Sequence, residues 1–131
     1  MGIVRVNPPE LAAPSGFAHA VIATGSRLIF LAGQTALDRS GSVVGASVTE
    51  QFEVALGNLV TALAAAGGRP TDLASLTVYA TDIEDYRAHG REIGAVWRRL
   101  AGRDYPAMAA IGVGRLWDPA ALVEVQGFAV I

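Results

Sequence analysis

The chain has 131 residues, of which 52% are hydrophobic and 17% are charged, and its formal net charge is −2. All ten basic residues are arginine, and no basic run is interleaved with aromatic residues, so nucleic-acid binding is not expected. The sequence contains no Cys, which excludes a disulfide, a thiolate nucleophile and a thiolate metal site.

Length and terminal pattern also indicate the kind of protein. We expect residues 1–131 to form a single domain, since this length is typical of one. The N-terminus has no signal-peptide pattern, and no apolar run is long enough to cross a membrane. We therefore expect a cytoplasmic protein that makes no membrane contact.

The first third of the chain predicts short strands separated by turns. We expect strands at residues 2–6, 17–23 and 27–32, with Thr24-Gly25-Ser26 as a tight hairpin turn between the last two. Val43-Val44 is predicted to add a short edge strand.

Two amphipathic helices are predicted further along the chain. Ser47 and Glu50 have the spacing of a capping box, and apolar residues then recur at three- and four-residue steps through residue 66. Thr81 and Glu84 have the same spacing before a second helix that ends at Gly102. The remaining segments with strand character are residues 72–80, 107–114 and 122–131.

This order of elements predicts an α+β fold with a six-stranded mixed sheet and two helices on one face. Two helices leave the second face uncovered, an area on the order of 500 Å². Residues 107–113 carry no polar side chain, which is typical of an interior strand covered on both faces. We expect copies of the chain to cover the bare face, with ligand sites in the clefts between subunits.

Several motifs, taken in order along nearly the whole chain, resemble the Rid family, which is also called the YjgF family. Its best-known branch is the reactive intermediate deaminases. The motifs are Phe17-Ala18-His19-Ala20-Val21, Arg27 to Gln34, Leu76 to Asp82, Tyr105-Pro106-Ala107 and Leu122 to Val125. The resemblance implies a chorismate-mutase-like fold and a homotrimer with a central barrel and a cleft between each pair of subunits.

The resemblance also implies site residues. The active branch hydrolyses enamines and imines to keto acids and ammonia without a cofactor. Its substrate-carboxylate Arg falls at Met108, its aromatic hydroxyl at Phe17, its helix Asn at Gly90 and its Cys at Ala110. The acidic residue of its last strand is matched by Glu124. We therefore expect a branch that lacks the Arg and does not perform the carboxylate-anchored reaction.

Glu124 is the polar residue on which a catalytic hypothesis can rest, because a carboxylate in a cleft can act as general base on water. The alternative is an ordinary Glu at a sheet edge or in an interface ion pair. Gly33 and Gln34 could offer amide donors to a ligand, or could form a strand-end turn. Phe17 and Met108 could line the pocket or belong to the core.

The remaining polar residues are weaker candidates for a functional site. His19 is more typical of a structural histidine, and the pair His89 and Glu92 lacks a third metal ligand, so no metal or cofactor is expected. Arg98, Arg99 and Arg103 are interpreted as a solvated face. We expect a homotrimer that binds a small molecule and hydrolyses or tautomerises an enamine-like, imine-like or carbonyl metabolite. The alternative is a non-catalytic ligand-binding or protein-interaction trimer.

Overall fold

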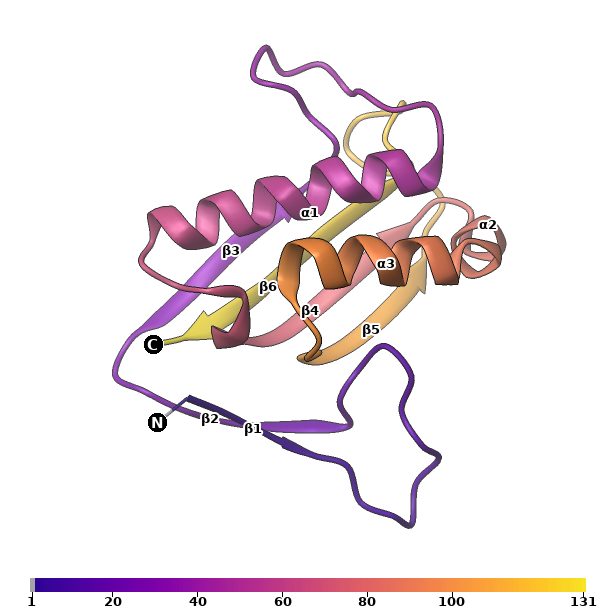
Figure 1. Cartoon of the computed structure of the whole chain (residues 1–131). Coiled ribbons are helices and arrows are strands. Elements are labelled where there is room, and N and C mark those ends of the chain that lie inside the picture. The colour runs from indigo at the N-terminus through magenta and orange to yellow at the C-terminus, as the bar shows by residue number, and fades with distance from the viewer. Residues whose placement is uncertain (1) are drawn as a thin grey trace.

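The computed structural model describes residues 2–131 as an α+β fold in which helices cover one face of a mixed four-stranded sheet (Figure 1). The strand order is β3-β6-β4-β5, with β4 and β5 parallel and the other pairs antiparallel. The strands are β3 (Leu28–Gln34), β4 (Leu73–Ala80), β5 (Ala107–Gly112) and β6 (Val123–Val130). The helices are α1 (Val48–Ala65), α2 (Ile83–Ala88) and α3 (Gly90–Ala101), with a short 3-10 helix, η1 (Pro70–Asp72), before β4.

A separate two-stranded sheet forms from β1 (Gly2–Val6) and β2 (Ala20–Thr24). The expected hairpin between residues 17–23 and 27–32 is therefore wrong, and so is the expected single six-stranded sheet. The chain crosses the end of β6 at this point, because Ser26 and Arg27 both donate backbone hydrogen bonds to the Ile131 carbonyl, at 2.9 and 2.8 Å. A Cβ at Gly25 would overlap Ile131, so glycine permits this close crossing. As a result β3 pairs with β6, and β1 pairs with β2 below the ends of the larger sheet (Figure 1).

Other boundaries also differ from the sequence prediction. Val43 forms only an isolated bridge with Leu37 and not a strand. The second predicted helix is two helices, α2 and α3, that meet at His89. The N-cap of α2 is Asp82, whose side chain accepts a hydrogen bond from the Asp85 amide at 3.0 Å, so the predicted cap at Thr81 is displaced by one residue.

The predicted cap and buried face of α1 are confirmed. The Glu50 amide donates to Ser47 Oγ at 3.1 Å, which satisfies one of the unpaired amides at the start of the helix. The apolar stripe of α1 is buried against the helix side of β6 and of the edge strand β3. Among residues 2–131, no helix is both long enough and apolar enough to cross a membrane.

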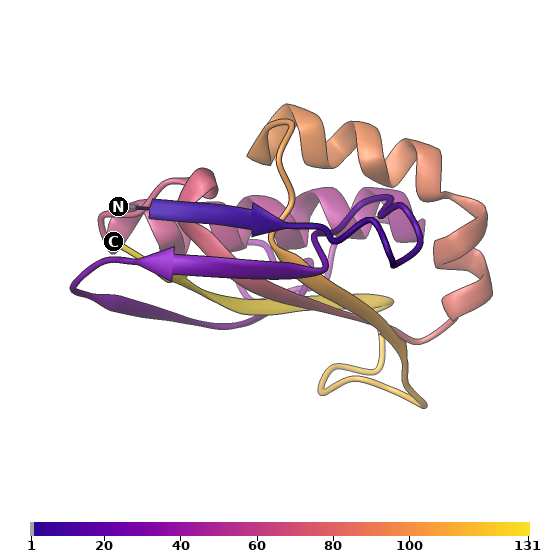
Figure 2. The same cartoon turned by 90° about the horizontal axis from the view of Figure 1, so that it is seen from below.

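The other face of the sheet has no helix over it, as the count of helices predicted (Figure 2). Large apolar side chains are exposed there: Leu28 is 59%, Phe30 77% and Phe128 37% exposed. The rings of Phe30 and Phe128 lie 6.0 Å apart. We call this surface the bare face; it also carries Ser75, Thr77, Tyr79, Ala107, Ala109, Ile111, Glu124 and Gln126.

The interior position expected for residues 107–113 is wrong. β5 is an edge strand whose only partner in the four-stranded sheet is β4, and Ala109 to Gly112 are exposed. Residues 107–113 lack polar side chains, although a single chain covers only part of their surface. The prediction failed because an apolar run does not show which strands lie beside it in the sheet.

Candidate functional site

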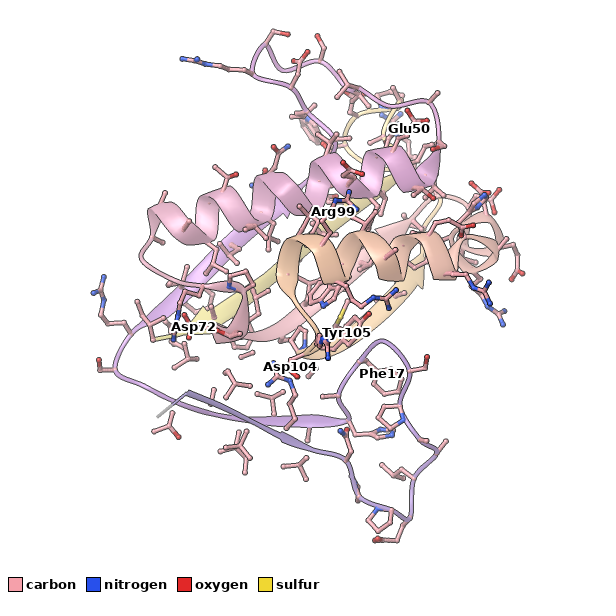
Figure 3. All side chains as sticks on the ribbon, viewed as in Figure 1. Phe17, Glu50, Asp72, Arg99, Asp104 and Tyr105 are labelled. Atoms are coloured by element: carbon pink, nitrogen blue, oxygen red, sulfur yellow. The ribbon has the colours of Figure 1, made fainter. Side chains whose placement is uncertain are left out.

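A cavity of about 570 Å³ lies on the helix side of β5, beside α2 and α3, and the loop before β2 forms part of its wall. Phe17, Gly90, Met108 and Ala110 all line it, so four of the residues assigned from the family resemblance lie together within one chain. Figure 3 shows Phe17 on the N-terminal loop and Tyr105 on the segment after α3. The volume is within the range usual for small-molecule sites. We call this cavity the helix-side pocket.

The pleat of β5 explains why Met108 and Ala110 face the pocket. Each lies opposite a β4 residue whose side chain is buried on the helix side, Met108 opposite Leu76 and Ala110 opposite Val78. Side chains two apart on a strand share a face, so the two positions present to the same cavity. Met108 also packs against the hydrophobic core. It therefore both lines the pocket and belongs to the core, the two roles between which the sequence could not decide.

The loop that carries Phe17 is tied to the segment just before β5. The Ala18 amide donates to the Pro106 carbonyl at 3.0 Å, and Arg5 Nε donates to the Tyr105 carbonyl at 2.7 Å. His19 places its ring edge-on to Phe17, with centroids 5.0 Å apart, and its Nε2 lies 2.7 Å from the Ala12 carbonyl. These contacts give His19 a structural role in holding the loop.

The aromatic wall of the pocket is built on α3. The Trp97 and Tyr105 rings stack at 5.1 Å with an interplanar angle of 16°. Trp97 Nε1 donates to the Asp104 carbonyl at 3.1 Å, so the buried indole is both packed and hydrogen bonded. Phe52 of α1 meets Tyr86 of α2 edge to face, with centroids 6.1 Å apart. Ring packing and a hydrogen bond therefore fix the positions of these aromatic side chains.

The hydroxyl of Tyr86 remains protonated over the range in which proteins usually work. Burial raises the pKa of Tyr86 to about 12, and the nearby Tyr105 adds a smaller contribution in the same direction. A protonated phenol can donate a hydrogen bond to a ligand. Tyr86 therefore contributes a donor to the pocket.

Glu124, Gly33 and Gln34 do not line this pocket. Glu124 alternates with the buried Val123 and Val125, so its side chain is on the bare face, opposite Tyr79 in the neighbouring strand. A Cβ at Gly33 would overlap the Glu124 carboxylate.

Glycine at position 33 leaves room for the Glu124 carboxylate in this rotamer. The backbone of Gln34 pairs with Val125, and its side-chain amide lies 3.5 Å from the Ala32 carbonyl. The resemblance grouped Glu124 with the pocket residues, whereas within one chain Glu124 and the pocket lie on opposite faces of the sheet.

Two arginines of the pocket wall were not identified from the sequence. Arg91 and Arg98 both line the cavity, although Arg98 was interpreted as part of a solvated face. The sequence contains a signal for them in the spacing of Arg91, Gly94 and Arg98, which are three and four residues apart and therefore lie on one side of a helix.

Acidic side chains are absent from the pocket wall as the structure describes it, whereas guanidinium and hydroxyl donors are present. The pocket can therefore bind an anionic group beside an apolar one, but a carboxylate base must come from elsewhere. Within residues 2–131, no group of three His, Asp or Glu side chains could hold a metal ion.

Comparison with known proteins agrees with the motifs. The sequence model of the family described as Endoribonuclease L-PSP matches residues 8–131. A RutC family protein of Pyrococcus horikoshii is 30% identical over 102 residues, covering 77% of each chain. The RutC family protein UK114 of Drosophila melanogaster is 30% identical over 125 residues, covering 95% of this chain and 84% of that one.

A solved structure shows the same fold. The crystal structure of a conserved Rid family protein of unknown function from Yersinia pestis superposes with a TM-score of 0.90 at 31% identity, covering all of both chains. The match of the family model over nearly the full length, together with these relatives, carries the assignment. This chain belongs to the Endoribonuclease L-PSP family, which includes the Rid/YjgF proteins that its motifs resemble.

Proposed function

We propose that residues 1–131 form a single Rid-like domain that assembles as a homotrimer and binds a small metabolite in a cleft between subunits. The metabolite is an enamine-like, imine-like or carbonyl compound that the protein hydrolyses or tautomerises without a cofactor. Glu124 is the general base that activates water or moves a proton. The carboxylate-anchored reaction of the family's active branch is not part of this proposal, because Met108 stands where that branch has Arg.

The observation that carries the proposal is the helix-side pocket. Phe17, Gly90, Met108 and Ala110, the positions that the family resemblance assigns to the site, line one cavity of about 570 Å³. Apolar and aromatic walls with a few polar donors are the usual character of a small-molecule site. This convergence supports a ligand site at the position that the resemblance implies.

Assembly is needed to bring a base to that pocket. Glu124 and the pocket lie on opposite faces of the same sheet, so one chain cannot supply both to one ligand. The exposed Phe30 and Phe128 give the bare face the apolar surface that an interface between copies would bury. We propose that Glu124 of one copy serves the pocket of its neighbour.

Sedimentation tests the assembly. The parental protein should sediment as a trimer at micromolar concentration, and Phe30→Glu should yield folded single chains because it places charges in an apolar interface. Circular dichroism establishes that the variant is folded. A parental protein that sediments as a single folded chain would refute both the trimer and the shared site.

Complementation tests the shared site. Glu124→Gln should lose turnover across a panel of imines and enamines while it keeps ligand binding. Gly90→Phe should lose binding, because no atom lies within 4 Å of a Cβ at Gly90 and the ring can extend into the open pocket without a clash. Co-expression of the two inactive variants should restore part of the activity if each site draws on two chains, whereas a site within one chain would give no rescue.

The second candidate, a non-catalytic binding trimer, makes the opposite prediction for the same panel. It is favoured by the absence of a carboxylate in the pocket wall. In that case the parental protein and Glu124→Gln would bind equally and neither would turn over any compound. Met108→Arg adds a further comparison: imine hydrolysis gained by this single change would identify the lost guanidinium as the reason for inactivity.

A further inference from the structure

The pocket-facing side of α3 carries two arginines with a gap between them. Arg91 and Arg98 are seven residues apart, which is two helical turns or about 10 Å along the axis, so their side chains leave the helix on the same side. Gly94 lies between them and has no side chain. Arg91 and Arg98 both line the helix-side pocket and are otherwise exposed, and the absence of a side chain at Gly94 leaves room for a ligand between them.

Neither arginine is neutralised within residues 2–131. The ion pairs found there involve Arg69, Arg87, Arg99 and His89. The contrast with the adjacent Arg99 is direct, since its Nη2 lies 2.6 Å from the Glu53 carboxylate on α1. Two cations at the wall of a cavity without acidic side chains favour an anion there.

The other polar groups at the gap are also donors. A Cβ built at Gly94 would lie 3.9 Å from Arg98 Nη1 and 3.9 Å from the Tyr105 hydroxyl, so these two atoms are at most about twice that distance apart. No hydrogen bond to the hydroxyl of Tyr105 or Tyr86 is found in the described part of the chain. A guanidinium and a phenol that converge on one point suit a carboxylate, which accepts several hydrogen bonds and can bind a guanidinium in bidentate fashion.

The apolar side chains of the pocket favour a particular kind of ligand framework beside the anionic group. Phe17, Met108 and the ring of Tyr105, which stacks on the buried Trp97, supply flat or adaptable apolar surface next to the donors. Aromatic rings pack well against such walls, by stacking or edge to face, and the thioether of Met makes favourable contacts with ring edges. A ring with one anionic group would satisfy both halves of the cavity.

We propose that the helix-side pocket binds a small aryl carboxylate, with the carboxylate held between Arg98 and Arg91 above Gly94 and the ring against Phe17, Tyr105 and Met108. The anion is thus anchored from helix α3 and not from strand β5. The inference builds on the ligand site proposed above and names its ligand class, but it concerns binding in one chain and requires neither turnover nor Glu124.

The protein carries a suitable optical probe. Its two tryptophans are Trp97, in the pocket wall, and Trp117, which is 94% exposed in the loop between β5 and β6. Trp117→Phe therefore leaves Trp97 as the only indole. In this full-length background, the fluorescence of Trp97 is titrated with benzoate and phenylpyruvate, and with benzamide as a neutral match for benzoate.

Benzoate or phenylpyruvate should change the fluorescence of Trp97 saturably, with at least about tenfold tighter binding for benzoate than for benzamide. Arg98→Ala should weaken benzoate binding about tenfold or more, and Arg91→Ala less, because charge-assisted hydrogen bonds to a carboxylate are lost. Gly94→Leu should abolish binding by filling the gap. Arg99→Ala is the matched control, since it removes a guanidinium from the adjacent position on the same helix and should leave the affinity unchanged.

Three results would overturn the inference. They are equal affinity for benzoate and benzamide, benzoate affinity that is unchanged in Arg98→Ala and in Arg91→Ala, and no saturable binding of either carboxylate up to millimolar concentration. Thermal melts followed by circular dichroism identify any variant that fails to fold, and Arg98→Lys then replaces Arg98→Ala. Arginine-dependent binding without turnover of any imine would support this inference and reject the catalytic proposal. Turnover combined with equal affinity for benzoate and benzamide would support the catalytic proposal and reject this inference.

Discussion

The two faces of the sheet differ in how complete they are within one chain. On the helix side, the pocket has walls from the N-terminal loop, the helices and β5, with aromatic side chains and its own hydrogen-bond donors. On the bare face, Glu124 lies between Gly33 and Tyr79 with no helix above it. The difference teaches that one chain keeps its apolar cavity and this carboxylate apart, so under the proposed function the two must come from different copies.

The largest contrast in stability should be between one aromatic side chain from each face. Trp97→Ala should lower the free energy of unfolding by about 3–5 kcal/mol, because Trp97 is only 2% exposed and fills the wall beside Tyr105. Phe30→Ala should change the stability of the isolated chain by less than about 0.5 kcal/mol, since Phe30 is 77% exposed. Urea unfolding at concentrations where the chain is dispersed measures both. A similar cost for both variants would mean that the bare face is covered in solution.

The overlap at Gly33 gives the next effect. Gly33→Ala should destabilise the fold by up to about 1.5 kcal/mol, because the added methyl group forces the end of the Glu124 side chain into another rotamer. Glu124→Ala removes the obstacle, so the double variant should recover most of that loss in a double-mutant cycle. Strictly additive costs would show that Glu124 does not lie over Gly33.

A smaller loss is expected at the start of α2, which carries Tyr86 into the pocket. Asp82→Ala removes the cap on the Asp85 amide and should cost about 1 kcal/mol. Asp82→Asn keeps a side-chain acceptor and should cost much less. Thermal unfolding compares the two variants, and equal costs would mean that the cap contributes only through its charge.

The smallest effect is a pH dependence at His89, where α2 meets α3. The hydrogen bond to the Asp85 carbonyl, helped by the negative charges of Asp85 and Glu92, raises the pKa of His89 above its usual 6.5. A raised pKa in the folded state adds stability that is fully present below pH 6.5 and is lost as the pH rises through the folded value. NMR titration of the His89 ring should report the raised pKa, and Asp85→Asn should lower it. An unchanged value in that variant would assign the shift to the backbone carbonyl alone.

The sequence predicted those parts of the fold that depend on local rules. The capped helix α1, the last strand and the uncovered sheet face follow from periodicity, capping residues and the number of helices, and the structure has them. Strand pairing was not predictable in this way. β2 leaves β3 because Gly25 crosses Ile131, a contact between residues more than a hundred positions apart, which no turn propensity contains.

The candidate site was predictable to a similar extent. Motif positions identified Phe17, Gly90, Met108 and Ala110 as neighbours, although nothing in their spacing shows that they meet. Which face of the sheet carries Glu124 depends on how β6 pairs with its neighbours. Because the sequence does not give that pairing, the separation of Glu124 from the pocket was not predicted. Arg91 and Arg98 could have been found by their helical spacing, but which side of α3 faces a cavity depends on the packed structure.

The fit of Glu124 over bare backbone has an evolutionary consequence. Positions 33 and 124 share one small volume, so a lineage that acquires a side chain at 33 should either shorten the residue at 124 or move its side chain to another rotamer. Aligned relatives that retain both a bulky residue at 33 and an acid at 124 should therefore direct that acid away from position 33.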